Sequence, residues 1–123
     1  MRLLIIEDDA AVLDALREVL EDEGHEVVVA ANGREAMRRL RDGRRPNLIL
    51  LDLMMPVMSG WEFREAQLQD ETLASIPTVI LTADGHAAQK SVELQSAGFL
   101  QKPIKPERLL QKVDEISHRA LPS

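Results

Sequence analysis

Residues 3–9 read LLIIEDD, four aliphatic side chains followed at once by three carboxylates. A second run, LILLD at residues 48–52, again ends its aliphatic stretch in an acid. Short aliphatic runs without polar alternation are typical of strands that are buried on both faces, as in a parallel sheet. The two runs therefore predict parallel strands that carry acids at their carboxyl ends.

Three further apolar runs, at residues 27–30, 78–81 and 99–100, complete a set of five predicted strands. Segments with apolar residues at helical spacing follow them, at residues 12–20, 36–40, 61–68, 87–97 and 109–120. Five strand–helix alternations predict an α/β fold, with a doubly wound five-stranded parallel sheet and five helices on its two faces. Because no linker or low-complexity segment interrupts the pattern, we expect one domain over residues 1–123, with no output domain.

The composition of the chain excludes several classes of function. The 123 residues contain no cysteine, which excludes disulfides, thiolate catalysis and cysteine-ligated metals. The net charge of −6 argues against binding along a nucleic-acid backbone. The arginines between Arg34 and Arg45 fall at helical spacing without aromatic residues, which favours a solvated helix face. No run approaches the roughly 18 apolar residues of a membrane span, and the first residues show no signal-peptide pattern. We expect a soluble, cytoplasmic protein without direct nucleic-acid contact or membrane insertion.

Charged and polar side chains follow four of the predicted strands. Glu7 and Asp8 come after the first strand and Asp52 ends the third, while Thr82 and Lys102 follow the fourth and the fifth. Ligands of such sheets bind beyond the carboxyl ends of the strands. We therefore expect these side chains to share one site.

The carboxylates of this site require a counter-charge. Two carboxylates about 4 Å apart repel each other by on the order of 4 kcal/mol at an effective dielectric constant near 20, so either one is protonated or a cation binds. Oxygen ligands without nearby histidine or cysteine select a hard cation such as Mg²⁺. Asp8 and Asp52 are the best ligand candidates, with the backbone carbonyl of Met54 as a third and Glu7 acting through water.

A magnesium site beside a lysine and a hydroxyl group suits a phosphoryl group. Lys102 and the metal would offset its charge, and Thr82 would donate a hydrogen bond to it. The chain has no glycine-rich phosphate loop, which argues against a nucleoside triphosphate. Asp52 is therefore the predicted nucleophile, since aspartate can form an acyl phosphate. In the connection that follows, we expect Pro56 to set the chain direction and Gly60 to give the backbone freedom before the next helix.

The sequence resembles the receiver domain of two-component response regulators. The resemblance covers essentially the whole chain and rests on four motifs: IIEDD at 5–9, DLMMPVMSG at 52–60, LTA at 81–83 and FLQKP at 99–103. It implies a flavodoxin-like fold with strand order 2-1-3-4-5, and a cis Lys102–Pro103 bond.

The resemblance also implies a role for each site residue. Asp52 would accept a phosphoryl group, Glu7 and Asp8 would hold Mg²⁺, Thr82 would be the switch hydroxyl, Phe99 the switch aromatic, and Lys102 the partner of the phosphoryl oxygens; Asp9 is not expected to be a ligand. Phosphorylation would draw Thr82 toward the new oxygens, Phe99 would follow, and the face built by the fourth helix, fifth strand and fifth helix would be remodelled. The implied partners are a sensor histidine kinase or a histidine phosphotransferase, and a downstream protein target. Such a receiver modifies itself and is not a conventional enzyme.

Departures from the usual receiver pattern leave an alternative open. Thr82 and Lys102 stand 20 residues apart, fewer than the family pattern expects, which shortens the fourth helix or its exit. A degenerate receiver that docks on its partner without phosphorylation is therefore the alternative. A Mg²⁺-dependent phosphohydrolase is disfavoured, because such enzymes need a second acid two residues after the nucleophile and Met54 stands there. Ser59 replaces the more frequent acid before Gly60, and we expect little effect.

Overall fold

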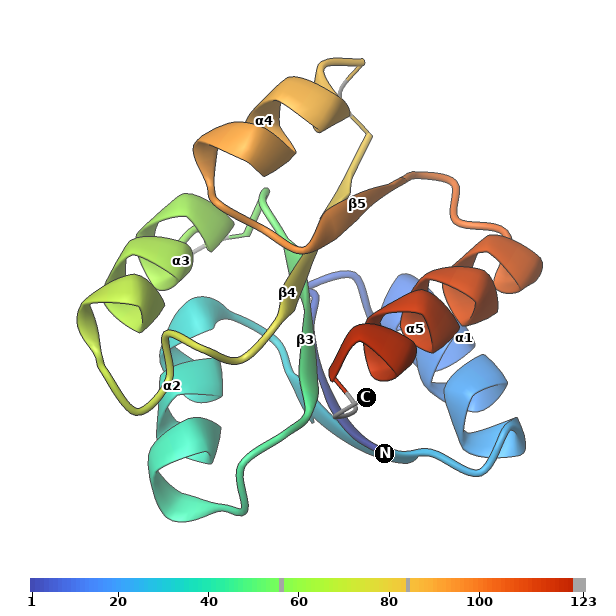
Figure 1. The fold of residues 1–123 in the computed structure, drawn as a ribbon, viewed down its shortest axis with the longest axis horizontal. Helices are drawn as coiled ribbons and strands as arrows, with labels where there is room; N and C mark the ends of the chain where they lie inside the picture. Colours follow the sequence, from blue (N-terminus) through green and yellow to red (C-terminus); the bar gives the residue numbers. More distant parts are fainter. Residues whose placement is uncertain (56, 84, 121–123) are drawn as a thin grey trace.

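The five predicted strands form one parallel sheet in the computed structural model, which describes residues 1–55, 57–83 and 85–120 (Figure 1). The strands lie in the order β2-β1-β3-β4-β5, and every neighbouring pair is parallel. This order, together with five helices, confirms the predicted flavodoxin-like fold. The strands are β1 (Arg2–Ile6), β2 (Glu26–Ala30), β3 (Leu48–Asp52), β4 (Thr78–Thr82) and β5 (Gly98–Gln101).

The helices cover both faces of the sheet, with α1 and α5 on one face, α2 and α3 on the other, and α4 beside β5 (Figure 1). They are α1 (Ala10–Asp22), α2 (Gly33–Asp42), α3 (Gly60–Gln69), α4 (Ala87–Glu93) and α5 (Pro106–Ala120). Among the described residues, no helix has the length and apolar character needed to cross a lipid bilayer.

The sheet divides the apolar core into two clusters. Along β1, Leu3 and Ile5 pack with the residues of α1 and α5, while Leu4 and Ile6 pack with those of α2 and α3. The central strands β3 and β4 are buried along their whole length. Burial on both faces explains why these strands lack the polar alternation of a half-exposed sheet.

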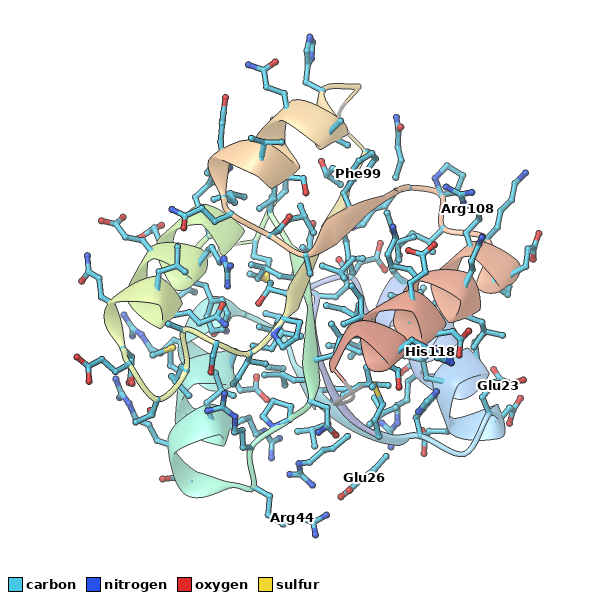
Figure 2. The ribbon with its side chains drawn as sticks, viewed as in Figure 1. Glu23, Glu26, Arg44, Phe99, Arg108 and His118 are labelled. Atoms are coloured by element: carbon cyan, nitrogen blue, oxygen red, sulfur yellow. The ribbon has the colours of Figure 1, made fainter. Side chains whose placement is uncertain are left out.

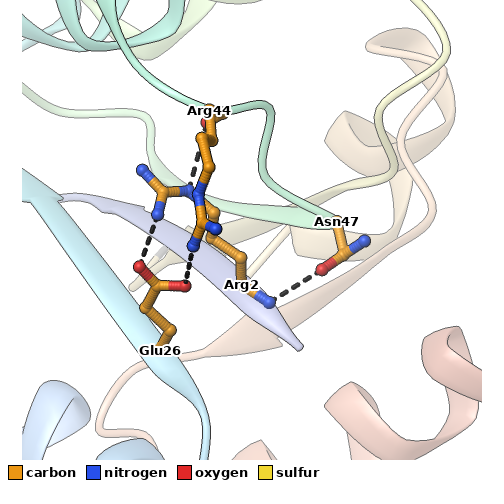
Figure 3. Close-up of polar contacts among 4 residues, drawn as sticks. All are labelled: Arg2, Glu26, Arg44 and Asn47. Atoms are coloured by element: carbon orange, nitrogen blue, oxygen red, sulfur yellow. Dashed lines mark hydrogen bonds and ion pairs between the residues drawn. The ribbon is translucent and has the colours of Figure 1, made fainter.

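A polar cluster ties the amino ends of β1 and β2 together, at the edge of the sheet opposite the acidic strand ends (Figure 3). Arg2 Nη1 lies 2.5 Å from Glu26 Oε1, and Arg44 Nη2 lies 2.8 Å from Glu26 Oε2. The backbone N–H of Arg2 donates to Asn47 Oδ1 at 2.7 Å. The arginines from Arg34 to Arg45 are exposed, as predicted for a solvated face.

Helix α4 is short and ends before its predicted boundary. It stops at Glu93, whereas the segment predicted to be helical extends to residue 97. Gln95 adopts the left-handed conformation, with φ of 53°, which ends the helix. The Ala97 N–H then donates to the Thr78 carbonyl at 2.8 Å as the chain enters β5. The short spacing between Thr82 and Lys102 thus accompanies a seven-residue helix with a tight exit.

Polar residues begin the helices on either side of the site. Asp9 caps α1 by accepting the N–H groups of Ala11 and Val12, so this third acid of the motif serves the helix. Ser59 caps α3 in a capping box, in which the Glu62 N–H donates to Ser59 Oγ and the Ser59 N–H donates to Glu62 Oε1, each at 3.2 Å. A serine therefore performs the capping that an acid would perform at this position.

Gly60 has a different role from the predicted one. A Cβ at this position would lie 2.4 Å from the Asp52 carbonyl oxygen and 2.6 Å from Leu53 Cα. The Gly60 N–H also donates to the Leu53 carbonyl at 3.1 Å. The missing side chain, rather than backbone freedom, is what allows α3 to begin against the end of β3. Pro56, which was predicted to set the chain direction, lies outside the described residues.

Gly60→Ala is expected to lower the free energy of unfolding by about 1–3 kcal/mol, because the new Cβ must displace backbone atoms. Urea unfolding followed by circular dichroism measures the change. Gly85→Ala is the matched control, since a Cβ there meets nothing within 4 Å; its effect should stay within about 0.5 kcal/mol. An unchanged urea midpoint for Gly60→Ala would contradict this account of the α3 start.

Candidate functional site

Three carboxylates gather at the carboxyl ends of β1 and β3. The parallel register pairs Ile6 with Leu51, so Glu7, which follows β1, lies beside Asp52, the last residue of β3. Together with Asp8 they offer ligand oxygens that all lie within 4.8 Å of one another. Glu7 and Asp52 are only 1% and 3% exposed, whereas Asp8 is exposed. The predicted acidic cluster is therefore present, with two of its members buried.

Lys102 reaches this cluster from the end of β5. Its Nζ lies 2.8 Å from Glu7 Oε2 and 3.4 Å from Asp52 Oδ1. The Lys102 N–H donates to the Thr82 carbonyl at 2.8 Å, which fixes the backbone from which the side chain extends. The Lys102–Pro103 bond is cis, as the resemblance implied. The structure thus brings the predicted lysine to the predicted acids.

Backbone N–H groups hold the two buried carboxylates in place. The Met54 N–H donates to Asp52 Oδ1 at 3.2 Å, and the Asp9 N–H donates to Glu7 Oε1 at 3.2 Å. The Met54 side chain itself is 76% exposed. Met54 therefore contributes through its backbone, while the use of its carbonyl as a metal ligand stays a prediction.

The electrostatics of the site favour additional positive charge. The pKa of Asp52 is raised to about 7, mainly by burial and then by the neighbouring Glu7, against the smaller lowering effects of Lys102 and the Met54 N–H. For Lys102, burial by itself lowers the pKa, but the hydrogen bond and charge of Glu7, together with Asp52, more than compensate and raise it. One ammonium group pairs with two buried acids, so Asp52 keeps its proton to a higher pH than an isolated aspartate unless more positive charge arrives.

The residues fit a hard divalent cation. Glu7 Oε2 is buried and, among the described residues, is reached by the Lys102 ammonium group alone. The atoms that could bind a metal ion here are carboxylate oxygens, the ligand type that Mg²⁺ prefers. Glu7, Asp8 and Asp52 would hold such an ion.

Comparison with known proteins identifies the family. The family model for the response regulator receiver domain matches residues 3–114. The chain belongs to this family. It is thus a receiver domain of the kind found in two-component response regulators.

The relatives of this receiver domain differ in length. It is 33% identical over 122 residues to the phosphate regulon transcriptional regulatory protein PhoB of Pseudomonas aeruginosa, covering 98% of this chain and 53% of PhoB. Among solved structures, the chemotaxis protein CheY4 of Vibrio cholerae has a TM-score of 0.84 at 31% identity, covering 94% of this chain and 97% of that one. The signal receiver domain of a signal transduction histidine kinase from Syntrophus aciditrophicus has a TM-score of 0.88 at 31% identity, covering 99% and 93%. The chain spans about half the length of the curated relatives that it matches.

The two residues predicted to form the switch of the receiver domain lie on one face of the sheet. Thr82 is buried and stands two residues beyond Ile80, which pairs with Phe99 on β5, so all three side chains point to the same side. Phe99 is partly buried against the cluster that includes Ile80 (Figure 2). Asp52 pairs in register with Leu81, the neighbour of Thr82. Thr82 therefore lies next to the strand partner of Asp52, and Phe99 lies on the same face of the sheet beside Ile80; their role as a switch stays a prediction.

One buried polar cluster of the receiver domain was not predicted from the sequence. Arg64 and Gln67 of α3 are 4% and 0% exposed, and both contact Thr78 at the start of β4. The sequence feature that could have indicated their burial is the three-residue spacing of Arg64 and Gln67, which places them on the same face of α3 as Gly60 and Phe63. That signal is weak, because long polar side chains at helical spacing usually mark a solvated face.

The raised pKa of Asp52 predicts how stability depends on pH in the metal-free protein. Because the folded pKa is about 7 against an ordinary 3.8, the folded state retains a proton that the unfolded state has already lost. The free energy of unfolding should therefore fall as the pH rises through about 7. Urea unfolding with EDTA at several pH values between about 5 and 8 measures this slope.

The matched variants for this prediction are Asp52→Asn and Asp14→Asn, a buried and an exposed acid. Asp52→Asn should flatten the slope and raise the stability near pH 8 by on the order of 1 kcal/mol, whereas Asp14→Asn should leave the slope unchanged. If the slope survives in Asp52→Asn, a different group is responsible for it.

Proposed function

We propose that this chain is a phosphorylation-dependent signalling receiver, in which Asp52 accepts a phosphoryl group from the phosphohistidine of a sensor histidine kinase or a histidine phosphotransferase. One observation carries the proposal: Asp52 is buried between Glu7 and Lys102, at the point where three acids and an ammonium group converge. An isolated strand-end acid would be solvated and would not require the lysine. The proposal includes a cytoplasmic location and a downstream protein target.

The chemistry follows from the groups around Asp52. An ionised Asp52 oxygen attacks the phosphorus atom, the P–N bond of the phosphohistidine breaks, and the imidazole nitrogen takes the electron pair. The product is an acyl phosphate on Asp52. Lys102 Nζ already lies 3.4 Å from Asp52 Oδ1, so it is positioned to pair with an oxygen of the incoming group.

Mg²⁺ would supply the charge neutralisation that this step needs. Glu7, Asp8 and Asp52 would hold it, with the Met54 carbonyl as the further ligand that we propose. The chain's own residues keep Asp52 oriented through the Met54 N–H. Each molecule is altered by the reaction, so the protein is a substrate of its own phosphorylation rather than an enzyme that turns over.

The switch would act through β4 and β5. Thr82 is one residue beyond the strand partner of Asp52, close enough in the fold to respond to new oxygens there. A movement of Thr82 changes the space available to Phe99 on the same face of the sheet. The face built by α4, β5 and α5 would then present a different surface to a protein target. PhoB is named as a transcriptional regulator and is about twice as long as this chain. We therefore propose transcriptional regulation only for a longer protein that contains this receiver domain.

Incubation with Mg²⁺ and acetyl phosphate or phosphoramidate is expected to add the mass of one phosphoryl group, because Asp52 is the ionisable nucleophile of the site. Intact mass spectrometry measures the adduct. Asp52→Asn should abolish it, and Asp14→Asn, an exposed acid on α1, should not. Absence of an adduct on the wild type would instead favour the degenerate receiver that docks without phosphorylation.

Beryllofluoride with Mg²⁺ is expected to change the fluorescence of Trp61, the single tryptophan of the chain. Trp61 follows Gly60, whose backbone lies against Asp52, and its ring centroid is 5.9 Å from Lys90 Nζ on α4. It therefore reports on both the acceptor and α4. A titration monitored by emission measures the change, and Asp52→Asn should remove the response. An equal response in that variant would place the binding event elsewhere.

A further inference from the structure

Helix α3 carries a buried guanidinium group that the proposed phosphorylation does not use. Arg64 is 4% exposed and donates four hydrogen bonds. Nη1 donates to Gln67 Oε1 at 2.7 Å and to Thr78 Oγ1 at 3.1 Å. Nε donates to the Leu94 carbonyl at 2.9 Å, and Nη2 donates to the Gln95 carbonyl at 2.7 Å. One side chain thus joins α3, β4 and the end of α4.

A charge buried in this way needs a structural reason. None of the ion pairs among the described residues includes Arg64, and burial lowers the pKa of its guanidinium group. Neutral oxygens alone compensate for the lost hydration, which makes the arrangement costly unless every partner is held in place. Gln67 is held: its Nε2 donates to the Leu73 carbonyl at 3.0 Å and to the Ile76 carbonyl at 3.1 Å. Gln67, which accepts a hydrogen bond from the guanidinium, is therefore fixed both by α3 and by the segment before β4.

The other two acceptors lie at the carboxyl end of α4. The last carbonyls of a helix have no partner within the helix and carry partial negative charge, so a buried cation is favourable there. This end has the hydrogen bonds of a Schellman motif, in which the Gln95 N–H donates to the Val92 carbonyl and the Ser96 N–H donates to the Ser91 carbonyl, both at 3.0 Å. Glycine usually occupies the left-handed position of this motif, but here it is Gln95, with φ of 53°. The bond from Arg64 to its carbonyl stabilises that conformation.

We propose that Arg64 is a positioning residue that pins the carboxyl end of α4 to α3, so that α4 rearranges by moving its amino end about this fixed point. The amino end is the one near the acidic site, since Ala87 begins the helix five residues after Thr82. The pin holds in the unmodified protein; the movement about it rests on the proposed function. A signal from Asp52 would then tilt α4 rather than shift it as a whole.

The test is residue-resolved amide hydrogen exchange on the full chain, without Mg²⁺ or a phosphoryl donor. Arg64→Met replaces the cation with an apolar side chain of similar length and leaves Gln67 and Thr78 bonded to each other. The carbonyls of Leu94 and Gln95 lose their donors, so the amides of residues 94–96 should exchange at least about tenfold faster. Unchanged exchange of these amides in a folded Arg64→Met protein overturns the proposal.

Thr78→Val is the matched control for this variant. It removes one acceptor of Arg64 from the same buried cluster but keeps both bonds to α4. The amides of residues 94–96 should retain their protection. If Thr78→Val accelerates their exchange as much as Arg64→Met does, general loosening of the core explains the result and the pin is wrong.

A second measurement uses the wild-type protein alone, so it does not depend on a variant that folds. Helix ends normally exchange faster than helix centres. A pinned end reverses this order, so the Leu94 and Gln95 amides should exchange no faster than the Lys90 amide, which donates to the His86 carbonyl at 3.0 Å. Faster exchange at Leu94 and Gln95 overturns the pin.

Adding Mg²⁺ and beryllofluoride to the wild type separates the two proposals. A change confined to the amides of residues 87–90 supports the pivot, and a change at residues 94–96 of equal size overturns it. If no amide changes and the Trp61 fluorescence does not respond, the proposed function fails. The contact of Arg64 with the end of α4 in the unmodified protein is then judged by the two preceding measurements alone.

Discussion

Repulsion between buried carboxylates at one edge of the sheet is the constraint on which this molecule depends. The parallel register of β1 and β3 brings Glu7 and Asp52 out of the sheet together, and burial prevents water from screening them. Lys102 offsets part of that charge from β5. Asp52 is therefore held near the boundary between protonated and ionised, where a bound cation has a large effect on the local energy.

The rest of the fold connects this charged site with the surface around α4. Residues next to the site in the strands, Thr82 on β4 and Phe99 on β5, lie on the face that α4 partly covers. Helix α3 touches both the site and α4, because its first residue lies against the Asp52 backbone and Arg64 in its middle donates to the Leu94 carbonyl at the end of α4. The site is thus built from neighbouring strands, and both the strand residues Thr82 and Phe99 and the Arg64 side chain of α3 lie between it and α4.

The sequence was sufficient for the strands, the acids and the lysine, because these depend on local apolar runs and on the rule that parallel strands end at one edge. It was insufficient where contacts between distant segments determine the conformation of a residue. The end of α4 could not be placed because Gln95 takes a left-handed conformation that sequence patterns assign to glycine. Gly60 was predicted to be a flexible residue, although its role comes from a neighbouring strand. Arg64 was not singled out from the sequence, because an arginine near Glu62 and Glu65 on a helix is typical of a solvated face.

The spacing of contacts along α3 has a consequence for how this chain can tolerate length changes. Gly60, Arg64 and Gln67 recur at four and three residues, so they share one side of the helix. One inserted residue between Gly60 and Arg64 would rotate the guanidinium by about 100° away from the end of α4 while leaving the contact of Gly60 with the Asp52 backbone intact. Insertions are therefore excluded from the first turns of α3, whereas the exposed residues 71–72 that follow it are free of this requirement.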